Sequence, residues 1–398
     1  MTWINMPVLK NKRKQVLKFI ALPVAILAVL FYAAWGIIGL YRQVQPKAAE
    51  PAELIKIDEP FSATVHFNDE LGTDDFSKLI VGAIDGAKKS VELAMYSMDS
   101  TVIRDAIYRA ADRGLDINLI FSDKRQATIN NLFADKRSNI RTSFIAPSAE
   151  GYMHHKFLLL DRGTDNQKLF FGSSNFTYIQ DRYDPSFILE TTRPELVRIF
   201  GEEFDRLDAA ANGRAESAIR HPFAARIEYP EGFLEIWFSP GTAEINIKDR
   251  MIALMRGAKD NIKAMIWYLT DKDMAAVLAE EAKTRPVDII TDDFNWSVAG
   301  SAFPILAAQK ERQGLDNLNI ITDRKRNQEM TQFLSNDSLN SFLHHHLLIV
   351  DDRIVVFGTE NWSSSGFFRN NESMMLSDIK SLVDAFDASY RFNYEADK

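Results

Sequence analysis

The sequence predicts an α/β protein with two pseudo-symmetric halves, each a mostly parallel sheet flanked by helices. Three observations predict this class. Apolar runs of strand length alternate with longer helical patterns. The segment from Phe67, FNDELGTDDFSKLIVGAIDGAKKSVELAMYSM, resembles the segment from Phe238, FSPGTAEINIKDRMIALMRGAKDNIKAMIWYL, with Gly-Ala-Lys at the same place in both. A chain of 398 residues is also long enough for two halves.

The N-terminus predicts a membrane anchor. Residues 1–18 carry lysine and arginine but no acid, and residues 19–41 carry no charge. The uncharged segment is long enough to cross a bilayer as one helix and exceeds a typical signal-peptide core. Because positive charge is denser before it than after it, we expect a cytoplasmic N-terminus and a periplasmic or extracellular main part. A cleaved signal peptide is the alternative.

The remaining chain divides into four segments. Residues 42–61, rich in Ala, Pro and Glu, are interpreted as a linker. The first half is expected over 62–207, a connector over 208–230 and the second half over 231–398. In each half the expected order is strand, helix, strand, helix, strand, hairpin and closing helix. The expected strands and closing helices include Val91–Tyr96, Ile117–Phe121, Pro194–Leu207, Ile262–Tyr268, Val287–Ile290 and Ile379–Tyr390.

Composition narrows the possible functions. Hydrophobic residues make up 46% and charged residues 26% of the chain, as in ordinary globular proteins. The net charge of −8 argues against a protein that holds nucleic acid by bulk charge, although a local basic groove stays possible. The chain has no cysteine, which excludes a disulfide framework and a thiolate metal site.

A short polar motif occurs in the first half, in GYMHHKFLLLDRGTDNQKLFFGSSNF. His154 and Lys156 stand two residues apart at the start of an apolar run that Asp161 closes. On an extended strand these two side chains share a face, and an imidazole beside an ammonium makes a place for a phosphate. A second apolar run then leads to Ser173 and Asn175, which could donate hydrogen bonds to phosphate oxygens.

The second half repeats this order in LHHHLLIVDDRIVVFGTENW. His344, Asp351, Thr359 and Asn361 take the matching places, and His346 stands where the first copy has lysine. A single H-x-K pair would be a weak signal, because chance supplies it often. Two copies, each followed by D and then G-[ST]-x-N inside a detectable repeat, are a strong one.

The pattern resembles the HKD motif of the phospholipase D superfamily, and the resemblance covers roughly residues 62–395. It implies that the two halves face each other around one shared active site. In this family one motif histidine attacks phosphorus to form a covalent phosphohistidine. The other protonates the leaving alcohol and then activates water or an acceptor alcohol. The resemblance implies no cofactor.

The family's roles carry over onto matching positions. His154, whose motif is complete, is expected to be the nucleophile and His344 the general acid and base, with the reverse assignment open. Glu372 resembles the acid that follows the second hairpin and supports a catalytic histidine, and Asp184 is the nearest acid in the first half. The residues expected to hold phosphate oxygens are Lys156, Ser173, Asn175, Thr359 and Asn361. The motif residues Asp161 and Asp351 are expected to fix the hairpin turns.

His346 is the one departure from the family's pattern. A lysine there would stay charged near neutral pH, whereas an imidazole is charged only on the acid side. We therefore expect an acid-shifted rate optimum. His344, His345 and His346 could also form a metal cluster, but only two share a strand face and no third ligand is evident. We expect no metal.

The substrate is less well defined than the reaction. The anchor and the acidic balance favour a phospholipid, whereas the Asn-Phe-Thr after Ser174 resembles the nuclease-like branch. Cardiolipin-synthase-like phosphatidyl transfer and a catalytically weak binding protein are further alternatives. We expect a monomeric catalytic unit. Basic residues such as Arg125 could form a steering rim or solvated loops, and the aromatic residues near the second motif could pack in the core or contact substrate: Trp296, Trp362, Phe367 and Phe368.

Overall fold

A computed structural model describes residues 51, 53–69, 75–148, 150–214, 223–322 and 342–396. The predicted anchor over residues 19–41 lies outside this part of the chain. Within it, no helix has both the length and the apolar character needed to cross a membrane.

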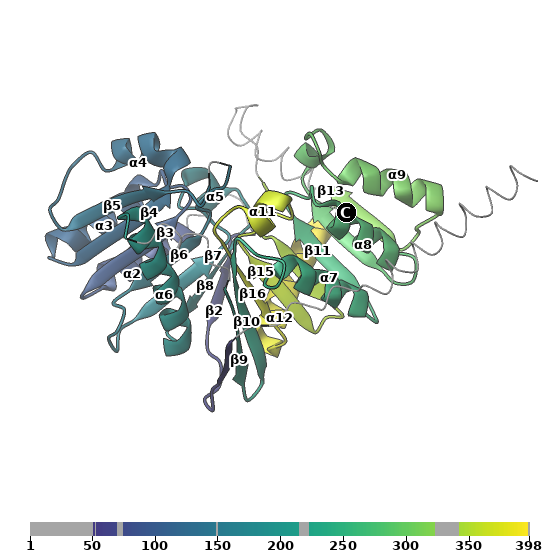
Figure 1. Cartoon of the computed structure of the whole chain (residues 1–398), viewed down its shortest axis with the longest axis horizontal. Helices are drawn as coiled ribbons and strands as arrows, with labels where there is room; N and C mark the ends of the chain where they lie inside the picture. The colour runs from purple at the N-terminus through teal and green to yellow at the C-terminus, as the bar shows by residue number, and fades with distance from the viewer. Residues whose placement is uncertain are drawn as a thin grey trace, which may run out of the picture. The chain divides into compact units, whose positions relative to one another are not determined.

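The first half forms a seven-stranded sheet of order β2-β8-β7-β6-β3-β4-β5 (Figure 1). Its strands are β2 (Thr64–Phe67), β3 (Ser90–Met95), β4 (Asp116–Ser122), β5 (Ile140–Ile145), β6 (Lys156–Leu160), β7 (Lys168–Gly172) and β8 (Phe187–Thr191). Its helices are α2 (Asp75–Gly86), α3 (Thr101–Asp112), η1 (Asp123–Arg125), α4 (Gln126–Leu132), α5 (Tyr178–Arg182) and α6 (Pro194–Ala211).

The second half forms a nine-stranded sheet of order β1-β9-β10-β16-β15-β14-β11-β12-β13. Its strands are β1 (Glu53–Lys56), β9 (Phe223–Tyr229), β10 (Gly232–Ser239), β11 (Ile262–Ile266), β12 (Val287–Thr291), β13 (Leu318–Thr322), β14 (Leu347–Val350), β15 (Ile354–Gly358) and β16 (Glu372–Ser377). Its helices are α7 (Ile247–Gly257), α8 (Lys272–Glu281), η3 (Asp293–Trp296), α9 (Phe303–Gln313), α11 (Ser364–Phe368) and α12 (Lys380–Ala396).

The prediction of two mostly parallel sheets is wrong, because both sheets are mixed. In the first half only β3, β4 and β5 pair in parallel, and the remaining neighbours are antiparallel. In the second half β11, β12 and β13 pair in parallel, as do β1 and β9, and the remaining neighbours are antiparallel. Helical crossovers join β3 to β4 and β11 to β12, whereas a short turn joins the two strands of each motif hairpin, which are therefore antiparallel.

Two segments that the sequence assigned to linkers contribute strands. Strand β1 lies inside the predicted linker and pairs in parallel with β9, which lies inside the predicted connector. In β1 alternate residues are exposed, with Leu54 58% exposed. A four-residue edge strand of this kind gives too short a pattern to detect in an Ala-, Pro- and Glu-rich stretch.

Apolar side chains hold the halves together as stacked layers. Helices α2 and α3 pack on one face of the first sheet, and α7, α8 and α9 on one face of the second. A single core cluster then joins the other faces of both sheets with α6 and α12. Because this core contains residues of both halves, the two motif hairpins face each other across it.

Candidate active site

Crossed backbone contacts place the two motif histidines. His154 lies just before β6, and its N–H donates to the carbonyl of Asn371, 2.9 Å away, just before β16 of the other half. In the same way the N–H of His344 donates to the carbonyl of Pro185 at 2.7 Å, just before β8. Both histidines line one cavity of about 820 Å³. The fold therefore brings both predicted histidines to one site.

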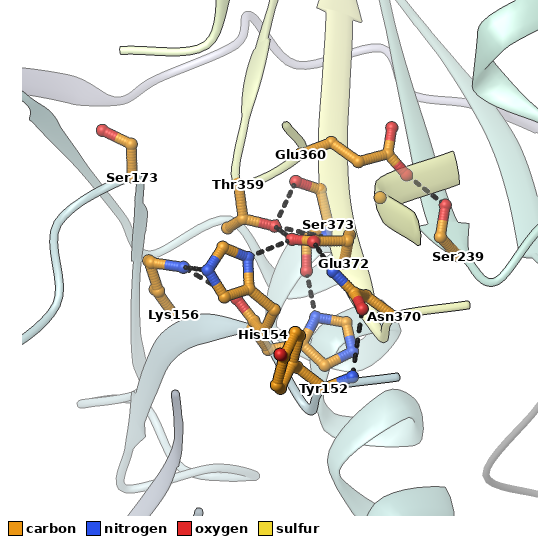
Figure 2. A network of polar contacts seen from close by, with 12 residues as sticks. Tyr152, His154, Lys156, Ser173, Ser239, Thr359, Glu360, Asn370, Glu372 and Ser373 are labelled. Carbon is orange, nitrogen blue, oxygen red and sulfur yellow. Dashed lines mark hydrogen bonds and ion pairs between the residues drawn. The ribbon is translucent and has the colours of Figure 1, made fainter. Parts of the chain in front are cut away.

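His154 is held by a buried carboxylate from the other half (Figure 2). Its Nδ1 lies 2.7 Å from Oε2 of Glu372, which is fully buried. This carboxylate also accepts hydrogen bonds from Thr359 Oγ1 at 2.6 Å and from Asn370 Nδ2 at 2.8 Å. Because a carboxylate accepts only, Nδ1 of His154 carries the proton and Nε2 keeps its lone pair.

Lys156 lies beside the reactive nitrogen of His154. Its Nζ is 3.1 Å from His154 Nε2 and donates to the His154 carbonyl at 2.9 Å. Burial lowers the pKa of Lys156 to about 7, against the opposing charge of Glu372. Burial also lowers the pKa of His154, and the charge of Lys156 adds to this effect while Glu372 opposes it. Burial and Lys156 thus favour the neutral form of His154, which a nucleophilic nitrogen requires.

His344 has a different environment. Its Nδ1 donates to the backbone carbonyl of Ser173 at 2.8 Å, and its ring centroid lies 5.3 Å from that of Trp267. Within the described ranges no carboxylate is in an ion pair with it. Burial, followed by the charges of Lys156 and His154, lowers its pKa well below the ordinary value. Both histidines therefore carry a proton on Nδ1, but His154 pairs with a carboxylate whereas His344 pairs with a backbone carbonyl.

The predicted phosphate ligands divide into two groups. Asn175 and Asn361 line the cavity, and their buried side-chain oxygens have no hydrogen-bond partner in the part of the chain described. Ser173 and Thr359 are placed differently from the prediction: Ser173 Oγ accepts from the N–H of Phe187 at 3.2 Å, and Thr359 donates to Glu372. Both are fully buried and stabilise the framework behind the cavity.

Asp161 and Asp351 lie at the far ends of β6 and β14 from the histidines, so their place among the predicted catalytic residues is corrected. Each carboxylate accepts backbone N–H groups from the segment that precedes β3 or β11. Backbone hydrogen bonds outweigh burial and lower the pKa of Asp351. Both residues have left-handed backbones, with φ of 52° and 57°. Their place is consistent with the expectation that they fix the hairpin turns.

His346, the one departure from the family's motif, lies behind His344 in the structure. The ring is fully buried, does not line the cavity and packs on His344 with centroids 4.7 Å apart. Neither ring nitrogen has a hydrogen-bond partner among the described residues. Burial, then the charges of His344 and Lys156, lowers its pKa well below the ordinary value. This burial favours a neutral imidazole at His346.

We accordingly expect His346→Lys to lower the free energy of unfolding by about 3–5 kcal/mol at pH 8, because it buries an ammonium without a partner. His346→Met, neutral and of similar length, should cost less than about 1.5 kcal/mol. Urea denaturation of the three proteins measures both changes. Wild-type stability in His346→Lys, with higher activity above pH 7.5, would contradict the neutral assignment.

Several cavity residues were not identified from the sequence. Tyr96 and Trp267 occupy matching places just after β3 and β11, and their rings contact His154 and His344 respectively. The internal repeat aligns these two residues at the end of a strand, and this shared position could have identified them as site residues. The four aromatic residues named from the sequence instead lie in or against the apolar core: Trp296, Trp362, Phe367 and Phe368.

Two further predictions concern Asp184 and metal binding. Asp184 is buried and lines the cavity, where its Oδ1 accepts the N–H of Phe342 at 2.9 Å. The consecutive histidines diverge, because His345 points away to Asp69 at 2.9 Å. Within the described ranges no three His, Cys, Asp or Glu side chains form a group that could hold a metal ion.

Comparison with known families gives one match in each half. A family described as "Cardiolipin synthase, PLD-like domain" matches residues 80–208 and 251–392, which together exceed half of the chain. The chain belongs to the phospholipase D superfamily. Each match contains one of the two motif hairpins, so the family assignment and the site geometry agree.

Individual phospholipase D relatives are more distant. The chain is 30% identical over 139 residues to the mitochondrial cardiolipin hydrolase of Danio rerio and 29% identical over 130 residues to that of Mus musculus. These matches cover 34% and 32% of this chain and 58% and 56% of the relatives, so the chain spans little more than half of their length.

Two solved structures share the fold. Phosphatidylserine synthase of Haemophilus influenzae Rd KW20 superposes with a TM-score of 0.61 at 15% identity, covering 84% of this chain and 87% of that one. Polyphosphate kinase of Porphyromonas gingivalis superposes with a TM-score of 0.52 at 12% identity, covering 84% and 50%. At these identities the likeness shows the fold alone.

Proposed function

We propose that the chain is a phospholipase D-type phosphodiesterase that cleaves phospholipids through a covalent intermediate on His154. The observation that carries the proposal is the His154–Glu372 pair at 2.7 Å, which faces His344 across one cavity. Glu372 holds the proton on Nδ1 and stabilises the positive imidazole that forms when Nε2 bonds to phosphorus. His344 has no such carboxylate among its described partners, so the proton-transfer role falls to it.

In the proposed reaction Nε2 of His154 attacks phosphorus and the bond to the leaving oxygen breaks. A bound phosphodiester anion raises the pKa of His344, which then gives its proton to that oxygen. Lys156, Asn175 and Asn361 stabilise charge on the nonbridging oxygens. Neutral His344 next takes a proton from water, the resulting hydroxide attacks phosphorus and the P–N bond breaks. An acceptor alcohol in place of water would give phosphatidyl transfer.

A phospholipid substrate is favoured by the predicted anchor and by the names of the hydrolase relatives. The apolar lining of the cavity from Trp267, Phe294 and Phe342 also suits a lipid. Nucleic acid, as in the nuclease-like branch, is the second candidate, since the same rings could stack on bases.

Turnover decides between these candidates. The full chain is incubated with bis(4-nitrophenyl) phosphate, then with vesicles of phosphatidylcholine, phosphatidylglycerol or cardiolipin, and with single-stranded DNA. Release of phosphatidic acid from a vesicle supports the proposal, and cleavage of DNA alone supports a nuclease. A chain that cleaves none of them is a binding protein. Addition of glycerol separates hydrolysis from transfer by the lipid product formed.

The proposal includes membrane attachment through residues 19–41 and an exported, monomeric catalytic part. Retention in membranes after carbonate extraction, with protease access from outside the cell, would support it. Release of the chain by carbonate would contradict the anchor.

We expect Glu372→Gln to reduce kcat by about 10²-fold or more, because the amide cannot balance a positive imidazole and favours the wrong tautomer of His154. Steady-state kinetics with bis(4-nitrophenyl) phosphate measures the change. Glu203→Gln is the matched control: Glu203 is also buried and lies 3.0 Å from a histidine, His155, that does not line the cavity. Equal losses of kcat in both variants would show that Glu372 acts only through folding.

A further inference from the structure

The two sides of the catalytic cavity differ in chemistry. The ring centroid of Tyr96 lies 4.8 Å from that of His154 and 5.9 Å from that of Tyr152. The guanidinium of Arg125 lies over the Tyr96 ring. Beside His344, the rings of Trp267 and Phe342 form an apolar wall, with centroids 5.4 Å apart. One side thus presents phenol hydroxyls and a guanidinium, whereas the other is aromatic and carries the carboxylate of Asp184, which accepts the N–H of Phe342.

Arg125 is held in place without a neutralising acid. Its guanidinium carbon lies 4.8 Å from the centroid of the Tyr96 ring, and Nη2 donates to the Tyr96 hydroxyl at 3.0 Å. No carboxylate within the described ranges forms an ion pair with it, and the adjacent Asp123 pairs with Lys124 at 3.4 Å. By contrast Arg369, the other arginine that lines the cavity, pairs with Glu150.

A guanidinium in this position suits an anion. Stacking on Tyr96 and the bond to its hydroxyl fix the plane of the guanidinium, which leaves its other N–H donors free to bind two oxygens of one phosphate. The site adjoins the nucleophile, because Tyr96 contacts both Arg125 and His154. We assign the scissile phosphate to Lys156 instead, because its Nζ lies next to Nε2 of His154.

We propose that Arg125 and Tyr96 form a second anion subsite, for a negative group that the substrate carries in addition to the scissile phosphodiester. This deepens the proposed function and rests on it. The substrate class is a phospholipid with a second phosphate close to the first. A cationic headgroup such as choline would meet the unneutralised guanidinium and be disfavoured.

Two soluble 4-nitrophenyl phosphodiesters test the subsite. They share the leaving group, and the other arm ends in a phosphate monoester in one and in a hydroxyl in the other. We expect wild type to prefer the first by about tenfold in kcat/KM, and Arg125→Gln to lose most of this preference. Arg125→Lys, which keeps the charge but loses the planar fork, should be intermediate. Arg369→Gln is the matched control and should leave the ratio unchanged.

An unchanged ratio in Arg125→Gln, or an equal fall in Arg369→Gln, overturns the subsite. If wild type cleaves neither diester, the proposed function fails and the subsite is tested by binding. Calorimetry with methylenediphosphonate should then show about tenfold weaker binding to Arg125→Gln than to wild type. Equal affinity would overturn the subsite independently of turnover.

The source of the second phosphate is tested with vesicles and DNA. Cardiolipin, with two phosphates, should be cleaved faster than phosphatidylcholine by wild type, and the difference should shrink in Arg125→Gln. If the variant instead changes only the cleavage of single-stranded DNA, the lipid assignment is overturned.

Discussion

Replacing either His154 or His344 with alanine should reduce phosphodiester cleavage by at least about 10²-fold. The two residues act at opposite sides of phosphorus, so loss of either one stops the reaction. Without His154 no nitrogen bonds to phosphorus. Without His344 the leaving oxygen departs unprotonated and water is not activated. Steady-state rates with bis(4-nitrophenyl) phosphate, measured against wild type at pH 6 to 8, give the size of each loss.

Both variants should stay folded, because both rings border the cavity. Thermal denaturation checks this point. His66→Ala is a matched control, since His66 pairs with Glu190 on β8 and does not line the cavity. It should keep wild-type kcat. A rate above about a tenth of wild type in His154→Ala or His344→Ala would contradict the two-histidine mechanism.

The histidine pair and much of each half's order of elements could be predicted because they depend on local pattern, but the expected order omits β5 and β8 in the first half and β13 and β16 in the second. Apolar runs mark β6 and β14, and the internal repeat doubles the signal of each weak motif. The predicted strand Val91–Tyr96 is found as Ser90–Met95, and the predicted helix Pro194–Leu207 as Pro194–Ala211. Such differences at element ends are normal, because the ends of strands and helices fray.

Features that depend on pairing between distant segments could not be predicted. The contact between Glu372 and His154 joins residues 218 positions apart, and no local pattern specifies it; the family resemblance indicated that Glu372 supports a catalytic histidine but not which one. The same holds for β1 on β9, which turned a predicted linker into an edge strand. The complete burial of His346 also depends on distant segments, and its place in the motif left its charge open.

Lys156→Met should abolish activity and at the same time stabilise the protein. The variant removes the ammonium beside Nε2 of His154, so we expect a rate loss of about 10²-fold or more. Burial of this ammonium also destabilises the folded state, since burial lowers the pKa of Lys156 from 10.5 to about 7. We expect the apolar side chain to raise the free energy of unfolding by about 1–4 kcal/mol at pH 7. Urea denaturation measures this gain.

The pH dependence of stability follows from the lowered pKa of Lys156. Between pH about 7 and 10.5 the unfolded chain holds a proton on Lys156 that the folded chain has released. Stability of wild type therefore rises with pH across this window through this residue, and is flat below it where both states are protonated. The advantage of Lys156→Met should be largest at or below pH 7 and shrink toward pH 10.5. Wild-type kcat/KM should fall as pH rises through about 7, because the free enzyme then loses the ammonium.

Lys263→Met provides the opposite case in the same protein. Lys263 lies 2.7 Å from Asp352 and 2.6 Å from Asp387, and these hydrogen bonds outweigh burial and raise its pKa. Its removal leaves Asp352 without an ion-pair partner among the described residues and Asp387 with Arg391 alone, so this variant should lose stability while it keeps wild-type kcat. Stabilisation by Lys156→Met together with destabilisation by Lys263→Met would show that the charge at Lys156 is needed for the reaction and destabilises the folded state. Destabilisation in both variants would instead assign Lys156 to the structural framework, as a cation whose charge balances that of the buried Glu372.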